Sequence, residues 1–81
     1  MKHSAYLEYL RLPVDKWTRF DYKQMWYATV GNVTILKSYD TRVGVVKNGV
    51  LYWAEKYSPT TSKQLTQYAN RFNLTKEQVV D

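Results

Sequence analysis

The chain has 81 residues and a formal net charge of +5, from 12 Lys and Arg against 7 Asp and Glu. A chain of this length predicts a single domain over residues 1–81, with a thin core. It has no cysteine, which excludes disulfides, thiolate metal sites and catalysis by a thiol. Its apolar runs are far shorter than the roughly 20 residues of a membrane helix. No apolar stretch follows the basic start, so we expect a cytoplasmic protein without a signal peptide.

Aromatic residues are frequent for this length, with eight Tyr and three Trp. Large aromatic side chains bury much area in a small core, and they are also enriched at binding sites. Composition does not separate these two uses, and we place the core first. The basic balance favours polyanionic partners such as nucleic acid, although the basic residues are scattered along the chain.

The N-terminal segment, residues 1–23, is predicted to be helical or irregular. A short helix, capped by its first residue, is expected over Ser4–Arg11. Pro13 ends this helix, because the residue before a proline disfavours helical backbone. Val14–Lys23 fits two alternatives: a second short helix capped by Asp15, or an irregular aromatic-rich segment.

Residues 24–57 are predicted to form an antiparallel sheet. Gly31-Asn32 and Asn48-Gly49 suit two-residue hairpin turns, because Gly and Asn tolerate positive φ, and Asp40-Thr41 is a weaker turn. The segments between these turns are rich in Val, Ile, Tyr, Thr and Trp, which is typical of strands. The four strands expected are Gln24–Val30, Val33–Tyr39, Arg42–Lys47 and Val50–Tyr57.

Three two-residue turns would fix the register of this meander. Arg42 then lies opposite Glu55 as a cross-strand ion pair, and no like charges lie opposite one another. One face carries the rows Tyr27-Leu36-Val45-Tyr52 and Met25-Ser38-Val43-Ala54. The other face carries the rows Ala28-Ile35-Val46-Leu51 and Trp26-Lys37-Gly44-Trp53.

The C-terminal segment, residues 58–81, is predicted to be helical. Thr61 and Gln64 have the spacing of a capping box, and an apolar stripe follows on a helix over Ser62–Phe72. Asn73 fits the left-handed position after the helix, and Thr75–Val80 is expected to add a helical turn. The expected fold is therefore α+β, a four-stranded antiparallel meander with this helix packed on one face and a short N-terminal helix.

The sequence gives no sign of catalysis. His3 is the only histidine and is expected at the solvated surface, and the acidic residues are dispersed without a close pair. The chain carries no metal-ligand spacing, phosphate-binding glycine loop or nucleophile elbow. We expect a binding protein without metal or cofactor, and not an enzyme.

The sheet supplies the candidate binding surface. Both faces are apolar, yet the C-terminal helix can cover only one. The other face needs the N-terminal segment, a second copy in a homodimer, or a partner. Trp26, Lys37, Arg42 and Trp53 share one face in the predicted register, and such a mixture suits stacked bases and phosphates of single-stranded nucleic acid. The alternative is that both tryptophans pack under the N-terminal helix.

A second candidate is an anion site at the start of the C-terminal helix. Thr60, Thr61 and Lys63 place hydroxyls and an ammonium where free N–H groups favour negative charge. The alternative is ordinary helix capping.

Two stretches, Leu36–Val43 and Tyr57–Lys63, resemble a small uncharacterised domain of phages and prophages of low-GC Gram-positive bacteria. The shared pattern is S-Y-x-T-x-V followed by Y-S-x-T-T-S-K, within residues 31–72. Relatives often have His where this chain has Gln64. The resemblance implies a fold and no activity.

A phage origin implies two functions. The first is a stoichiometric inhibitor that binds and occludes a host defence nuclease in the bacterial cytoplasm, of the anti-CRISPR kind. The second is a nucleic-acid-binding accessory protein, which the net charge and the tryptophan face favour.

Overall fold

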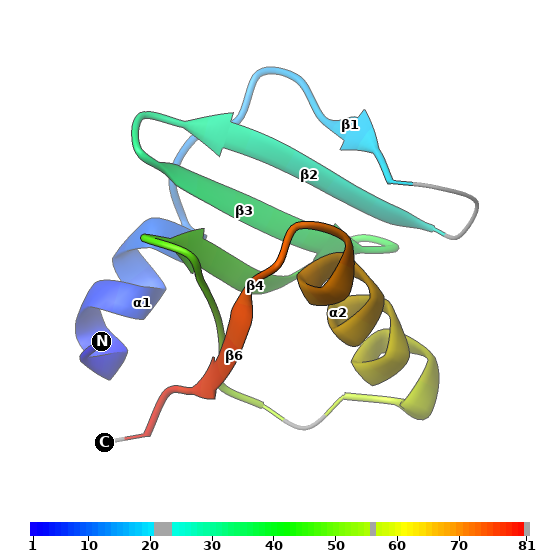
Figure 1. The fold of residues 1–81 in the computed structure, drawn as a ribbon. Helices are drawn as coiled ribbons and strands as arrows, with labels where there is room; N and C mark the ends of the chain where they lie inside the picture. The colour runs from blue at the N-terminus through cyan, green and yellow to red at the C-terminus, as the bar shows by residue number, and fades with distance from the viewer. Residues whose placement is uncertain (21–23, 56, 81) are drawn as a thin grey trace.

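The computed structural model describes residues 1–20, 24–55 and 57–80, and it has two helices and a six-stranded sheet (Figure 1). The elements are α1 (His3–Leu10), β1 (Thr18–Arg19), β2 (Met25–Val30), β3 (Val33–Ser38), β4 (Thr41–Lys47), β5 (Val50–Trp53), α2 (Pro59–Arg71) and β6 (Thr75–Gln78). The strands lie in chain order, all neighbours are antiparallel except the parallel pair β5–β6, and α2 joins that pair. The predicted α+β class is confirmed, whereas the predicted four-stranded meander is wrong because the sheet has two further strands, β1 and β6.

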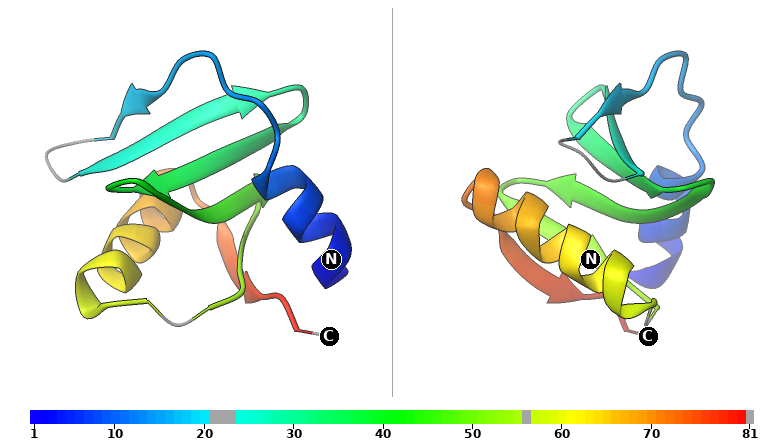
Figure 2. Two further views of the ribbon diagram at one scale, coloured as in Figure 1. Left: turned by 180° about the vertical axis from the view of Figure 1, so that it is seen from behind. Right: turned by 90° about the vertical axis from the view of Figure 1, so that its right-hand side faces the viewer.

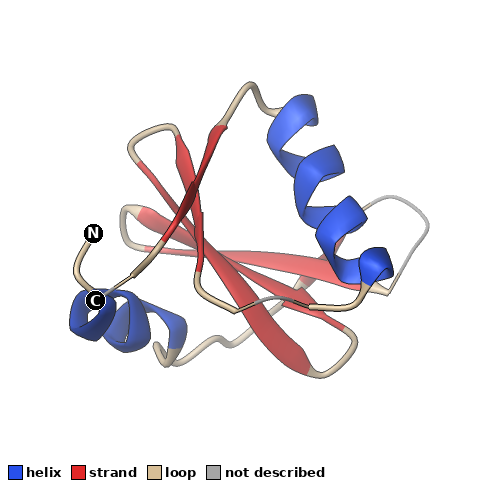
Figure 3. Ribbon diagram, turned by 90° about the horizontal axis from the view of Figure 1, so that it is seen from below, coloured by secondary structure: helices blue, strands red, loops and turns tan. Residues whose placement is uncertain are grey.

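The two helices lie on opposite sides of the sheet (Figure 3). The α2 side holds the larger core, and its buried residues are Phe20, Met25, Leu36, Val43, Leu51, Leu65, Tyr68 and Ala69. The α1 side has a smaller core of Tyr6, Val33, Val45 and Val79, with Leu7 and Leu10 packed against it. The N-terminal helix thus covers the face that the sequence left open, so the uncovered face no longer argues for a homodimer.

The N-terminal segment departs from its prediction at two places. Lys2 is the N-cap of α1, with no side-chain capping bond, so the prediction that Ser4 caps this helix is wrong. β1 pairs with β2 through Thr18↔Tyr27 and Arg19↔Trp26, so the second short helix is wrong for the described residues. Residues 21–23 lie outside the described part of the chain.

A bulge in β4 changes the predicted register of the central strands. The ladder runs Ser38↔Thr41 and Lys37↔Arg42, then continues as Leu36↔Gly44, so Val43 is an extra residue without a partner on β3. The predicted alignment of Leu36 with Val45 is therefore wrong. An unbroken strand would put Val43 and Val45 on the same face, whereas the bulge turns them into the two different cores.

The outer hairpins agree better with the sequence. The predicted β2–β3 register is confirmed, and so is that of β4–β5 over Val45↔Tyr52, Val46↔Leu51 and Lys47↔Val50. Asn48 and Gly49 both have positive φ, 52° and 78°, as their turn requires. The β4–β5 ladder ends at Val45↔Tyr52, so the pairs expected beyond it, Gly44 with Trp53 and Arg42 with Glu55, are not formed in the ladder.

α2 begins three residues before its predicted start. Ser58 is the N-cap, its Oγ accepts a hydrogen bond from the Thr61 N–H (3.3 Å), and Pro59 occupies the first turn. Thr61 and Gln64 are buried instead of capping: the Ser38 hydroxyl lies 3.2 Å from Thr61 Oγ1 and donates to Gln64 Oε1 (2.7 Å). These polar contacts fix α2 against β3.

The end of α2 is as predicted, and the segment after it is not. Asn73 has φ 58°, and the Leu74 N–H donates to Ala69 O (2.8 Å), the bond of a Schellman cap. The helical turn predicted over Thr75–Val80 is wrong, because Thr75–Gln78 forms strand β6. The Thr75 N–H donates to Gly49 O, and the Val79 N–H, just after the strand, donates to Trp53 O. Burial of Val79 in the α1-side core overrides the local preference.

Tyr68 is the centre of an aromatic cluster under α2. Its ring centroid lies 5.0 Å from that of Phe20, 5.8 Å from Tyr27 and 4.7 Å from Phe72. Burial, and after it the neighbouring Tyr27, raise the pKa of Tyr68 to about 12. The neutral phenol is therefore favoured in the folded state.

We expect stability to fall at high pH through Tyr68. Its contribution is complete below pH 10.0, the ordinary pKa of tyrosine, and is lost as the pH rises through about 12, because the unfolded chain loses the proton first. Urea unfolding between pH 9 and 12 should show this fall, and Tyr68→Phe should lose part of it. Tyr39→Phe, at an exposed position, is the control, and an equal fall in all three proteins would contradict the assignment.

Ser38→Ala should lower the free energy of unfolding by about 1–3 kcal/mol, because it leaves the buried Gln64 Oε1 without its donor and removes one of the two hydroxyl partners of Thr61 Oγ1. Ser62→Ala removes the same hydroxyl from an exposed position of α2 and should change it by less than about 0.5 kcal/mol. Chemical denaturation of both variants measures the difference. Equal effects would mean that the buried contacts do not stabilise the fold.

Candidate functional site

A row of basic and aromatic side chains crosses four strands on the α1 side of the sheet. β1–β4 each contribute one residue, and the pairings run Arg19↔Trp26, Trp26↔Lys37 and Lys37↔Arg42. Neighbouring strands lie about 4.8 Å apart, so the row is about 14 Å long. Its side chains share a face because directly opposed residues point the same way.

Trp17 completes this surface from the segment between α1 and β1, which runs along the α1 side of the sheet (Figure 2). Lys37 Nζ lies 4.5 Å from the centroid of the Trp17 ring, and Arg42 Cζ lies 5.3 Å from it. Arg19 Cζ and Lys37 Nζ each lie 5.8 Å from the Trp26 ring. We call Trp17, Arg19, Trp26, Lys37 and Arg42 the cationic patch.

The register places two like charges, Lys37 and Arg42, directly opposite each other. Like charges in this position destabilise a sheet, and the predicted register contained no such pair. The Trp17 ring offsets part of the repulsion, because both cations lie within reach of its electron-rich face. A bound anion would relieve the rest.

Arg42 also connects the sheet to α1. Its Nη1 donates to Leu10 O (2.9 Å) and to Leu12 O (2.5 Å), carbonyl groups at the C-terminal end of the helix. A cation here is favoured by the helix dipole. Arg42 therefore positions α1 as well as adding charge to the patch.

The predicted binding face is divided between the two sides of the sheet. Trp26, Lys37 and Arg42 come together, but Trp53 packs against the α2-side core, next to Leu51 on the same strand face. Lys76 Nζ lies 5.8 Å from the Trp53 ring. The expectation that all four share a face is wrong, as is the alternative in which both tryptophans pack under α1, because Trp53 lies on the opposite face.

The predicted anion site at the start of α2 has fewer free N–H groups and hydroxyls than expected. Thr61 is buried and its N–H is capped by Ser58, while Thr60 and Lys63 are exposed. Pro59 has no N–H, and the Ser62 N–H donates to Ser58 O. This arrangement resembles ordinary capping.

A cleft of about 360 Å³ lies between α1 and the segment after β5. Its lining includes His3, Tyr6, Arg42, Glu55 and Tyr57. The Tyr6 hydroxyl donates to Val43 O (3.4 Å). Burial, and after it the neighbouring Tyr57, raise the pKa of Tyr6. Burial, and after it the neighbouring Glu55, raise the pKa of Tyr57. Both phenols therefore keep their protons at neutral pH and can donate hydrogen bonds but not act as bases.

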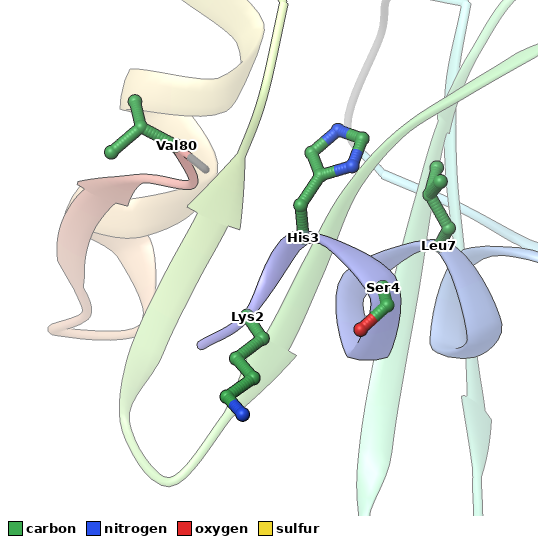
Figure 4. A pocket seen from close by; sticks show the side chains of 5 residues that line it. All are labelled: Lys2, His3, Ser4, Leu7 and Val80. Carbon is green, nitrogen blue, oxygen red and sulfur yellow. The ribbon is translucent and has the colours of Figure 1, made fainter.

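A second hollow, of about 460 Å³, lies at the first turn of α1 (Figure 4). It is lined by residues of α1 and its N-cap, which are Lys2, His3, Ser4 and Leu7, and by Val80 from the segment after β6. His3 thus belongs to the helix and lines both hollows. Over the described residues, no three His, Cys, Asp or Glu side chains gather to hold a metal ion. No helix in the described part of the chain has the length and hydropathy to cross a membrane.

The fold and the patch define a small α+β protein with a cationic, aromatic surface. The chain belongs to DUF8033, a family of unknown function whose model matches residues 11–80. No curated protein and no solved structure matches it. The prediction that the chain belongs to an uncharacterised family is confirmed, and the match also covers the N-terminal aromatic segment. The phage origin and the anti-CRISPR character stay predictions.

Sequence reasoning missed two members of the patch, Trp17 and Arg19. The signal was present as W-T-R at residues 17–19, where a tryptophan and a cation alternate with a β-branched residue. The segment was too short to predict a strand without knowing the edge of β2 on which it pairs.

Arg42→Ala should lower the free energy of unfolding by about 1–2 kcal/mol, because two carbonyl groups lose a charged donor. Arg42→Lys keeps the charge without the fork of donors and should recover only part of the loss. Arg11→Ala, at an exposed arginine, is the control and should change the value by less than about 0.5 kcal/mol. An Arg42→Ala variant as stable as the control would contradict the link to α1.

Proposed function

We propose that the protein binds single-stranded nucleic acid through the cationic patch. The observation that carries this proposal is the row Arg19–Trp26–Lys37–Arg42 with Trp17 over its cations. Three cations and two indole rings meet there on one side of a sheet. Phosphates need cations, and unstacked bases need aromatic surfaces, so this combination suits a single strand.

Charge supports the proposal. The opposed Lys37 and Arg42 repel each other in the free protein, and a phosphate between them would offset this repulsion with two attractions. The net charge of +5 also attracts a polyanion such as nucleic acid at longer range. Arg42 has donors committed to α1, so we assign most of the phosphate contact to Lys37.

The shape of the surface favours a single strand over a duplex. The patch lies across strands, and neither α1 nor α2 contributes a side chain to it. Sequence readers of duplex DNA commonly insert a helix or a two-stranded ribbon into the major groove. Half-buried tryptophans on a sheet can stack only on bases that are already unpaired.

Inhibition of a host defence nuclease remains a prediction from the sequence resemblance. It needs a protein target, which the nucleic-acid binding experiment below does not contain. A protein that binds no nucleic acid at low salt would leave that inhibitor as the next function to test, beginning with CRISPR-type nucleases.

The proposal is tested by fluorescence anisotropy with labelled single-stranded DNA and RNA at several salt concentrations. We expect the affinity to fall with salt, with a log–log slope of about −1.4 to −2.1 if two to three phosphates are contacted. Lys37→Ala should weaken binding about 5-fold and make the slope shallower. Trp26→Ala should weaken it at least about 5-fold through lost stacking.

Two variants serve as matched controls. Lys63→Ala removes the same charge from the exposed start of α2, and Trp53→Ala removes an indole on the opposite face. Neither should change the affinity by more than about 2-fold when the protein is folded, and circular dichroism checks folding. Equal losses in Lys37→Ala and Lys63→Ala would contradict a localised patch.

A further inference from the structure

Tyr39 has a backbone conformation that does not suit its side chain. It lies in the turn between β3 and β4 with φ 55°, in the left-handed region, where Gly and Asn are the residues of choice. Its N–H donates to Gln24 O (2.7 Å), so this conformation continues the pairing of β2 with β3. The sequence placed the turn one residue later, at Asp40-Thr41, where no aromatic residue would be strained.

The described residues give the Tyr39 ring little packing that would offset this cost. The side chain is 58% exposed, which is unusual for a large aromatic residue. Phe72, which is also exposed, has the rings of Phe20 and Tyr68 and the guanidinium of Arg71 as neighbours. Among the described residues, no aromatic or cationic side chain stacks on Tyr39.

Tyr39 is close to the cationic patch in the sheet. Lys37 and Arg42 form one cross-strand pair, Ser38 and Thr41 form the next, and the turn follows directly. The rise of a strand places Tyr39 about 7 Å along β3 from Lys37. A strand of nucleic acid that contacts Lys37 can therefore reach the turn with its next nucleotide.

We propose that Tyr39 is a stacking residue for a base of the nucleic acid bound at the cationic patch. The proposal rests on the proposed function and adds a residue outside the row. Backbone strain maintained at an exposed aromatic side chain is explained when the ring contacts a ligand. A tyrosine at the tip of a turn presents its ring to solvent, where any base can stack on it regardless of sequence.

The test compares Tyr39→Asn, Tyr39→Phe and the unmodified chain by thermal unfolding and by anisotropy with single-stranded DNA. Tyr39→Asn suits the turn, so we expect the melting temperature to rise by about 3 °C while the affinity falls at least about 5-fold. The salt slope should not change, because no charge is removed. Tyr39→Phe keeps the ring and should bind like the unmodified chain.

Each outcome decides the proposal. If the unmodified chain and Lys37→Ala behave as expected while Tyr39→Asn binds with full affinity, Tyr39 is not a contact and the proposed function stands. If Tyr39→Asn lowers the melting temperature, the ring stabilises the fold and the stacking role is overturned. If the unmodified chain binds no nucleic acid, the proposed function fails and this inference fails with it.

Discussion

The extra residue in β4, Val43, determines which side chains of the sheet meet each helix. The bulge places Val43 in the core under α2 and Val45 in the core under α1, so both faces receive a valine from the same short strand. Gly44 suits the position beside it, since a Cβ there would make a tight contact of 3.3 Å with Tyr52 O. One shift of register in β4 therefore supplies buried valines to the cores on both sides of the sheet.

Polar contacts then fix each helix at that register. Ser38 connects to Thr61 and Gln64 of α2, and Arg42 connects to the carbonyl groups at the end of α1. Each contact needs the position that the bulge and the turn give to its strand residue. A buried hydroxyl and a partly buried guanidinium tolerate few hydrogen-bond geometries, so these contacts select one arrangement where apolar packing alone would accept several.

The same register creates the cationic patch. It brings Lys37 opposite Arg42 and aligns both with Trp26 and Arg19, so two like charges that repel each other lie within the proposed binding surface. The strained turn at Tyr39 lies at the end of this row. Strained backbone and opposed like charges that occur close together are typical of binding sites, because ligand binding can offset their energetic cost.

The sequence by itself determined the local features of this protein. The Asn48-Gly49 turn, the cap at Asn73 and the apolar stripe of α2 depend on neighbours along the chain, and they were predicted because propensity and spacing describe such neighbours. Three of the four residues predicted for the binding face also proved to be adjacent in space. The bulge at Val43, the edge strands β1 and β6 and the burial of Thr61 were decided by the tertiary structure. They depend on which distant segments share a core, and one residue of register there moved Trp53 to the opposite face from Trp26.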